Sequence, residues 1–213
     1  CIRDRKYLSK SDYYFIDDLL KINDKKKDVL FFDINSKKKI ILVSYKKNIT
    51  DSETESLGAK FYDNIKEIKQ NNFIINSDIT KSISKKFIGH FLHGIKLKSY
   101  IFQKYKSKKS IKKLTITVIG KNLTPKADQL KFKAIEDGTF FARDLVSEPG
   151  NILHPDEYAK RLNSLKKIGL KINVYDEKKL KKLGMHTLLG VGQGSIRGSY
   201  LVTMEWKGLK NNS

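Results

Sequence analysis

Histidines and a few acidic side chains are the residues of this chain whose types and spacing could perform chemistry. His90 and His93 lie three residues apart in a segment with helical periodicity, so they could share a face and bind a metal ion. No carboxylate lies within one helical turn of them in the sequence, and they flank the apolar Phe91 and Leu92. Ordinary packed or surface histidines are therefore the alternative to a metal site.

The other titratable candidates favour structural roles over catalytic ones. Asp144 and Glu148 are four residues apart but straddle a predicted helix end, and Arg143 beside them favours an ion pair or a cap over acid–base catalysis. His154 occupies a position typical of a helix N-cap, although Ser, Thr, Asp or Asn would cap better. His186 follows a predicted turn and has no evident partner. We expect no catalytic, cofactor-binding or metal-binding residue among these groups.

Two further classes of site are disfavoured by their missing residues. The glycine-dense stretch GVGQGS, residues 190–195, resembles a phosphate cradle, but a dinucleotide fingerprint needs a sixth-position glycine and a following helix. We instead expect a tight loop that leads into a strand. The chain contains no Gly-x-Ser-x-Gly motif, so covalent acyl transfer has no candidate nucleophile. The single cysteine, Cys1, can form neither an internal disulfide nor a cysteine zinc site.

The elements that must position these residues alternate between strand and helix. A helix ends near Ser147, because Pro149 excludes its predecessor from the helical region, and a new helix starts at Pro155 with Asp156 and Glu157 in its first turn. Hydrophobic patterns predict strands at 29–32, 40–45, 73–75, 114–120, 170–175 and 200–206, and helices from 50, over 83–95, 126–147, 155–168 and 176–183. We infer an α/β fold with a mostly parallel sheet.

The break between these helices divides the chain into two predicted domains. An N-terminal α/β domain is expected over residues 6–147, including a linker helix at about 126–147 with Ala127, Leu130, Ala134, Phe141 and Leu145 directed inward. A second domain is expected over 148–213, and it looks incomplete. Residues 1–5, CIRDR, match what a common adapter sequence would encode, so we treat them as a possible non-native scar.

A net charge of +21 raises the alternative of a lysine-rich nucleic-acid-binding α/β module. The densest stretch, KYKSKKSIKK at residues 104–113, includes the aromatic Tyr105. Against this, 39 of the 44 basic residues are lysines, spread along the chain among Asn and Ile, which favours a solvated surface. No apolar run is long enough to span a membrane and no secretory signal is evident, so we expect a cytoplasmic protein without a membrane partner.

The residues after the helix break resemble the leucyl aminopeptidases of the cytosol-aminopeptidase type, a metallopeptidase family. The resemblance lies in FFARDLVSEPGNILHPDEYAKRL (140–162), VYDEKKLKKLGMHTLLGVGQGS (174–195) and YLVTMEWKG (200–208). It is specific over residues 142–195 and looser upstream, where GIKLKSYIFQKYKSKK (94–109) is also similar. His154 departs from the usual Thr or Ser cap of the family, and His186 and Trp206 also depart from its common residues.

The resemblance implies a macro-like N-terminal α/β domain, joined by a long helix to the start of an α/β aminopeptidase catalytic domain. It implies an intact enzyme that releases N-terminal amino acids from peptides, uses two divalent metal ions (Mn or Zn) and forms a homo-hexamer. The family's metal ligands, a lysine, three aspartates and a glutamate, lie beyond a segment that would begin after Gly208. We therefore expect this chain to be a fragment that lacks the metal-binding and catalytic residues and is inactive alone.

Overall fold

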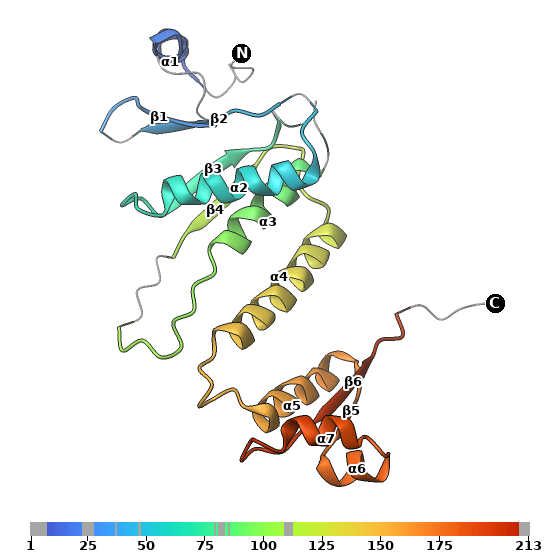
Figure 1. Cartoon of the computed structure of the whole chain (residues 1–213). Helices are drawn as coiled ribbons and strands as arrows, with labels where there is room; N and C mark the ends of the chain where they lie inside the picture. Colours follow the sequence, from blue (N-terminus) through green and yellow to red (C-terminus); the bar gives the residue numbers. More distant parts are fainter. Residues whose placement is uncertain are drawn as a thin grey trace, which may run out of the picture. The chain divides into compact units, whose positions relative to one another are not determined.

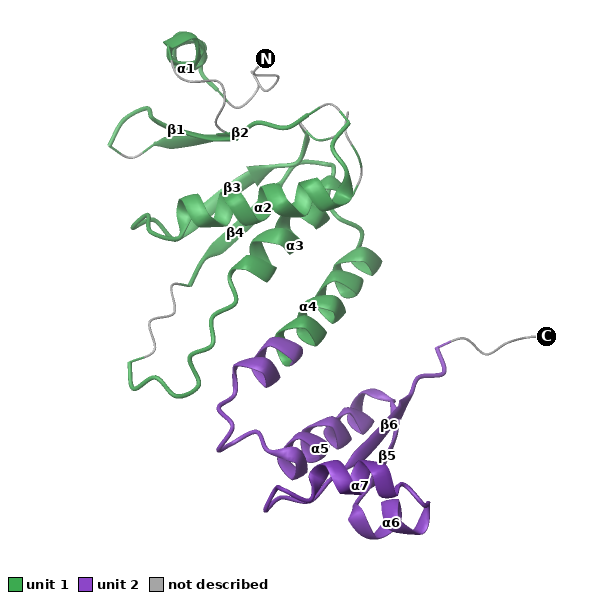
Figure 2. Cartoon of the chain, in the orientation of Figure 1, with its two compact units in different colours: residues 1–141 green, residues 142–213 purple. Residues whose placement is uncertain are grey.

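The computed structural model divides the chain into two compact units, residues 1–141 and 142–213 (Figure 2). It describes residues 8–22, 28–36, 38–46, 48–78, 80, 84, 86–108 and 113–208. The proposed scar at 1–5, the start of the helix expected from Ile83, and residues 109–112 of the lysine-rich stretch lie outside this described part. The division between the units falls inside a long helix, earlier in the chain than the break at 148–154.

The first sheet of unit 1 is an antiparallel hairpin. Strand β1 (Val29–Asp33) pairs with β2 (Lys39–Val43), with Phe31 opposite Ile41. The five residues between the strands are too few for a crossover, so the second strand can only return antiparallel to the first. A turn closes the hairpin, since the Ile34 N–H donates to the Lys38 carbonyl at 2.9 Å. Helix α1 (Lys10–Ile22), which sequence reasoning missed, contacts this connection through an ion pair of 2.5 Å between Asp12 and Lys38.

The second sheet of unit 1 is parallel. Strand β3 (Asn72–Asn76) pairs with β4 (Thr115–Ile119), and Ile74 lies opposite Thr117. The crossover between the two strands contains helix α3 (Phe87–Lys98), as parallel pairing requires. Among the described residues, this is the one strand pair with the predicted parallel direction.

Helices α2 and α3 form the centre of unit 1 (Figure 1). Helix α2 (Asp51–Ile65) begins with a capping box, in which the Glu53 N–H donates to Thr50 Oγ1 at 3.2 Å and the Thr50 N–H donates to Glu53 Oε2 at 2.9 Å. The core consists of residues from both helices and the hairpin: Val29, Leu57, Phe61, Ile65, Phe87, Ile88, Phe91 and Ile95. Their spacing gives each helix one buried stripe.

Helix α4 (Lys126–Ser147) contacts α3 through a different face from the one predicted. Phe132 lies 5.0 Å from His93 between ring centroids, and Glu136 pairs with the same histidine. The predicted inward residues Ala127, Leu130 and Ala134 are exposed, whereas Phe141 is half-buried and Leu145 is buried. The prediction of the inward face was therefore wrong over the first half of this helix, because the Phe132 ring and the Glu136 carboxylate, not the smaller aliphatic stripe, pack against α3.

Unit 2 contains short helices around an antiparallel strand pair. Helix α5 (Pro155–Asn163) continues into a 3-10 turn η3 (Ser164–Ile168), followed by β5 (Lys171–Tyr175). Helices α6 (Glu177–Lys182) and α7 (His186–Gly192) then precede β6 (Leu201–Glu205). Strand β5 pairs antiparallel with β6, with Asn173 opposite Thr203. Ala159, Leu162, Ile172 and Leu180 are buried here.

The α/β class is confirmed, but the predominance of parallel pairing is not. Among the described residues there are three two-stranded sheets, and two of the three are antiparallel. In both antiparallel pairs, the connection does not return the chain to the end of the sheet where the first strand began. The second strand therefore runs in the opposite direction. The described part of the chain includes no helix with the length and apolar composition needed to cross a membrane.

Candidate functional site

The two histidines on α3 face carboxylates from other helices. His90 Nδ1 lies 2.7 Å from Glu55 Oε1, and its Nε2 lies 3.2 Å from Asp51 Oδ2. His93 is 4% exposed and its Nδ1 lies 3.1 Å from Glu136 Oε1. Since Glu55 is 35 residues from His90 and Glu136 is 43 residues from His93 in the chain, the local sequence gave no sign of these contacts. Both histidines link α3 to its neighbours, which is a packing role.

The described residues do not fit a metal ion. No group of three or more His, Cys, Asp or Glu side chains within the described ranges has an arrangement that could hold one. His90 has each ring nitrogen against a carboxylate oxygen, so neither nitrogen is open toward a shared centre. His90 and His93 also both contact the ring of Phe132, at 4.9 and 5.0 Å between ring centroids. No catalytic step through a metal is therefore assigned to this part of the chain.

We expected the glycine-dense stretch to be a tight loop that leads directly into a strand, and the structure differs from this expectation. Gly190 and Gly192 belong to α7, and residues 193–200 then connect this helix to β6. A nucleotide-binding glycine loop would instead precede a helix and present its N–H groups there. His186 is the exposed first residue of the same short helix. The stretch thus has the wrong order of elements for a phosphate cradle.

Polar residues also gather at the carboxyl ends of the parallel strands, a position where α/β proteins often bind ligands. Sequence reasoning did not identify this group. Ser77 Oγ accepts from the Asn122 N–H at 3.2 Å, Asp78 Oδ1 accepts from the Lys121 N–H at 2.6 Å, and Thr80 Oγ1 accepts from Asn122 Nδ2 at 2.8 Å. These side chains join the two strand-end loops to each other, so the hydrogen bonds explain their presence without a ligand.

The break between α4 and α5 has the local structure that the sequence predicts. Pro149 follows the last turn of α4, and its carbonyl accepts from the N–H groups of Ile152 and Leu153 at 2.9 Å each. His154 is the N-cap of α5, with extended backbone angles of φ −100° and ψ 171°, and Pro155 is the first helical residue. The His154 side chain makes no capping hydrogen bond to the helix. Its position was predicted correctly, and the weak capping also agrees with expectation.

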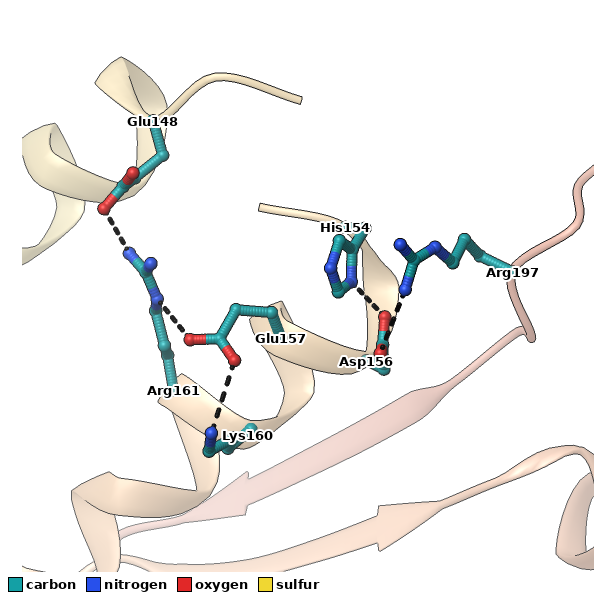
Figure 3. A network of polar contacts seen from close by, with 7 residues as sticks. All are labelled: Glu148, His154, Asp156, Glu157, Lys160, Arg161 and Arg197. Atoms are coloured by element: carbon teal, nitrogen blue, oxygen red, sulfur yellow. Dashed lines mark hydrogen bonds and ion pairs between the residues drawn. The ribbon is translucent and has the colours of Figure 1, made fainter. Parts of the chain in front are cut away.

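A polar network spans this break (Figure 3). The Glu148 carboxylate, 1% exposed, accepts from Arg161 Nη1 at 2.7 Å, and Arg161 Nε donates to Glu157 Oε1 at 3.1 Å. The hydrogen bonds that Arg161 donates to Glu148 and then to Glu157 raise the pKa of Arg161, and the bond from Arg161 lowers the pKa of Glu157. The end of α4 is thereby attached to α5. Arg161 is thirteen residues from Glu148 in the sequence, so the local spacing gave no sign of this contact.

A second set of contacts holds the start of α5. His154 Nδ1 hydrogen-bonds to Asp156, whose other carboxylate oxygen lies 3.5 Å from Arg197 Nη1 (Figure 3). Burial raises the pKa of Asp156, but the bond with His154 and the charge of Arg197 outweigh it, so the pKa is lowered overall. These contacts fix charged side chains against one another. The arrangement stabilises the helix break and offers no group poised for acid–base catalysis.

Comparison with known proteins finds similarity in the same region. The family model for the catalytic domain of the cytosol aminopeptidase family matches residues 140–213. A probable cytosol aminopeptidase of Brucella ovis is 46% identical over 125 residues, which are 55% of this chain and 25% of that protein. Those of Caulobacter vibrioides and Sinorhizobium fredii are 42% and 40% identical over 128 and 137 residues. The chain thus spans about a quarter of the length of these relatives.

Solved structures support the fold. The bottromycin maturation enzyme BotP in complex with Mn has a TM-score of 0.71 and 18% sequence identity, and the match covers 88% of this chain and 41% of that one. BotP in a second structure has a TM-score of 0.69 at the same identity. At this level of identity the likeness concerns the fold alone. It extends beyond the residues matched by the family model, into unit 1.

Proposed function

We propose that the chain is part of a leucyl-type aminopeptidase, because residues 140–213 match the model for the catalytic domain of the cytosol aminopeptidase family. In this proposal, unit 1 is the N-terminal α/β domain, and unit 2 is the beginning of the catalytic domain. The observation that carries the proposal is the family match, which starts in the last two turns of α4 and includes the whole network around Glu148 and Arg161.

The finer parts of the proposal concern the intact enzyme. It releases N-terminal amino acids from peptides, uses two divalent metal ions, Mn or Zn, and works as a homo-hexamer in the cytoplasm. The structure of BotP in complex with Mn supports the use of a divalent metal, and the names of the curated relatives support the aminopeptidase activity. Bound metals would supply Lewis-acid activation of the scissile carbonyl and of water. Because the described residues hold no metal-binding group, we propose that residues 1–213 alone bind neither ion tightly and are inactive.

Hydrolysis of leucine p-nitroanilide in the presence of Mn²⁺ tests the proposal. Two proteins are compared: residues 1–213, and the product of the longest reading frame that the source DNA encodes through this region. We expect activity in the longer product and none in residues 1–213. A longer product that folds, binds Mn²⁺ and still leaves the substrate intact would contradict the aminopeptidase assignment.

Isothermal titration with Mn²⁺ and Zn²⁺ tests the second part separately. We expect residues 1–213 to bind either ion no better than an unrelated lysine-rich protein of similar charge. Stoichiometric binding in the micromolar range or tighter would contradict it. A His90→Gln and His93→Gln variant would then show whether the α3 histidines are the ligands.

A further inference from the structure

Positive charge is concentrated in one part of unit 1. Residues 79–127 contain thirteen lysines and no aspartate or glutamate, although the whole chain has 23 acidic residues. Eight of these lysines lie within residues 96–113, around the carboxyl end of α3 and the connection to β4. These 49 residues contain lysines but no carboxylate, so their positive charge is not balanced within the segment. The average composition of the chain does not indicate this local excess.

The fold gathers further lysine at the same end of unit 1. Helices α2 and α3 run parallel, because Glu55 near the start of α2 pairs with His90, and Asp63 near its end pairs with Lys98 at 3.0 Å. Both carboxyl ends therefore lie together. Asp63 also pairs with Lys66 at 3.0 Å, so one carboxylate serves two lysines. The connection that follows α3 leaves from this end as a loop (Figure 1).

An aromatic side chain stands among the lysines of this loop. Tyr105 is 52% exposed, and its ring is braced edge-on by Phe102, with 5.8 Å between the ring centroids. Lys104 Nζ lies 5.6 Å from the centroid of the Tyr105 ring. Lys106 and Lys108 follow and are exposed. The loop thus presents an accessible aromatic ring with cations on both sides of it in sequence.

The ordinary role of lysine at a helix end explains part of this pattern only. Lys96 and Lys98 lie in the last turn of α3, where cations interact favourably with the helix dipole. Lys104, Lys106 and Lys108 lie beyond the helix, so the dipole does not account for them. A solvated lysine surface, the reading favoured by composition, does not account for the braced and exposed Tyr105 either.

We propose that Lys96, Lys98, Lys104, Tyr105, Lys106 and Lys108, here called the lysine–tyrosine surface, bind single-stranded nucleic acid. Lysine ammonium groups neutralise successive phosphates, and an unpaired base stacks on Tyr105, which is the combination used by sequence-tolerant single-strand binders. A duplex would keep its bases paired and leave the ring unused. The loop is not an amphipathic helix, so a lipid surface fits it less well. This inference is independent of the aminopeptidase proposal.

Fluorescence anisotropy of residues 1–213 with a labelled 20-nucleotide oligo-dT tests the surface. The variant K104Q/K106Q/K108Q removes three charges from it, and K178Q/K181Q/K182Q removes three from exposed positions of α6 in unit 2. We expect the first variant to lose at least tenfold in affinity and about 2 units of the salt slope, at roughly 0.7 per phosphate contact. The second variant should stay within about twofold of the parent.

A second pair of variants isolates the ring. Tyr105→Ala should lose about five- to a hundredfold in affinity, with the salt slope unchanged, since stacking does not release counterions. Tyr14→Ala, which removes another exposed tyrosine in unit 1, should change nothing. Because all these side chains are exposed, circular dichroism of each variant should match the parent.

The proposal is overturned by any of three results. Equal weakening by the two lysine triples would show an unspecific charge effect, and an unchanged affinity of Tyr105→Ala would remove the stacking contact. Competition by heparin or by phosphatidylserine vesicles that matches unlabelled oligo-dT at equal charge would show a surface for polyanions in general. Preferential competition by single-stranded over double-stranded DNA supports the surface as described.

Discussion

At the scale of single residues, the buried charge of Glu148 depends on Arg161 for its compensation. The Glu148 carboxylate is nearly inaccessible, whereas the Arg161 side chain is 19% exposed and also donates to Glu157. Removal of one partner of a buried pair leaves an uncompensated charge. We expect Arg161→Met to lower the free energy of unfolding of unit 2 by about 3 kcal/mol, the lower end for such pairs because Arg161 is partly exposed.

Urea denaturation of the Arg161→Met protein measures this loss, and Lys160→Met provides the matched control. Lys160 is adjacent in the same helix and lies 3.6 Å from Glu157, but its side chain is 81% exposed. We expect a change of less than about 0.5 kcal/mol for this variant. Equal effects of the two substitutions would mean that the Glu148 contact contributes no more than an ordinary surface charge.

The same residues give the protein an acid-sensitive contribution to stability. The pKa of Glu157 is lowered below its usual 4.5 by the bond from Arg161, so its contribution is complete above pH 4.5 and is lost as the pH falls through the lowered value. Asp63, Glu53 and Glu205 have lowered pKa values for similar reasons. We expect unfolding free energy to decrease from pH 5 to pH 3. In Arg161→Met the part from Glu157 should disappear, which urea titrations at both pH values would show.

Sequence reasoning identified local contacts and missed distant ones. The Thr50–Glu53 capping box and the Pro155 helix start were predictable, because each depends on residues within one turn. The contact of Glu148 with Arg161 was missed because the two residues lie on opposite sides of a helix break. The carboxylates that meet His90 and His93 come from other helices, so no spacing rule could have revealed them.

At the scale of elements, two glycines determine how closely α2 and α3 approach. A Cβ at Gly58 would lie 2.0 Å from the Phe91 carbonyl oxygen, and one at Gly94 would lie 1.9 Å from the Glu55 carbonyl oxygen. A Cβ at Gly138 in α4 would meet nothing within 4 Å. We expect Gly58→Ala to lower the unfolding free energy of unit 1 by about 3 kcal/mol through overpacking.

Gly138→Ala is the opposite case, a helical glycine with room for a side chain. We expect it to raise the unfolding free energy by roughly 0.5–1 kcal/mol, because alanine restricts the unfolded chain and favours the helix. Thermal denaturation of both variants would show shifts of Tm in opposite directions. A loss of stability in both would mean that glycine at position 138 is needed for a contact outside this chain.

The long helix shows why amphipathic patterns alone misassign a face. Ala127, Leu130 and Ala134 form a regular apolar stripe, yet they are exposed, while Phe132 and Glu136 face α3. Periodicity locates a stripe but does not tell which neighbour covers it. A Phe that contacts two histidines and a Glu that pairs with one of them were not recognisable as a helix interface from their hydrophobicity.

At the scale of the whole molecule, the two units have cores of different size. Among the residues that the structure describes, eight buried apolar residues form the core cluster of unit 1, whereas unit 2 buries Leu145, Ala159, Leu162, Ile172 and Leu180. A smaller buried apolar surface gives lower stability. We expect unit 2 to unfold first, at a lower urea concentration than unit 1.

Trp206, the single tryptophan of the chain, reports on unit 2, where its ring lies against Gly169. Its fluorescence should change at lower urea than the far-ultraviolet circular dichroism, to which the helices of both units contribute. Coincident transitions by the two probes would contradict independent units and indicate one cooperative molecule.

The overall organisation was predictable in part. Apart from the missed helices α1 and α7, the order of strands and helices followed from periodicity and breaks, and the family resemblance agrees with the match at 140–213. Strand direction was not predictable in the same way, because alternating strands and helices favour parallel pairing only when each helix returns the chain to the start of the sheet. The second unit and the hairpin do not meet that condition.

The close approach of α2 and α3 also limits how this sequence can diverge. At Gly58 and Gly94 the obstacle to a side chain is the opposite backbone, which every amino acid possesses, so no substitution on the neighbouring helix can make room for one. Core positions elsewhere can exchange volume in compensating pairs, but these two cannot. Where distant relatives retain this helix crossing, they should have glycine at the positions of Gly58 and Gly94. These two positions could then anchor a sequence alignment of relatives whose overall identity is too low to align them otherwise.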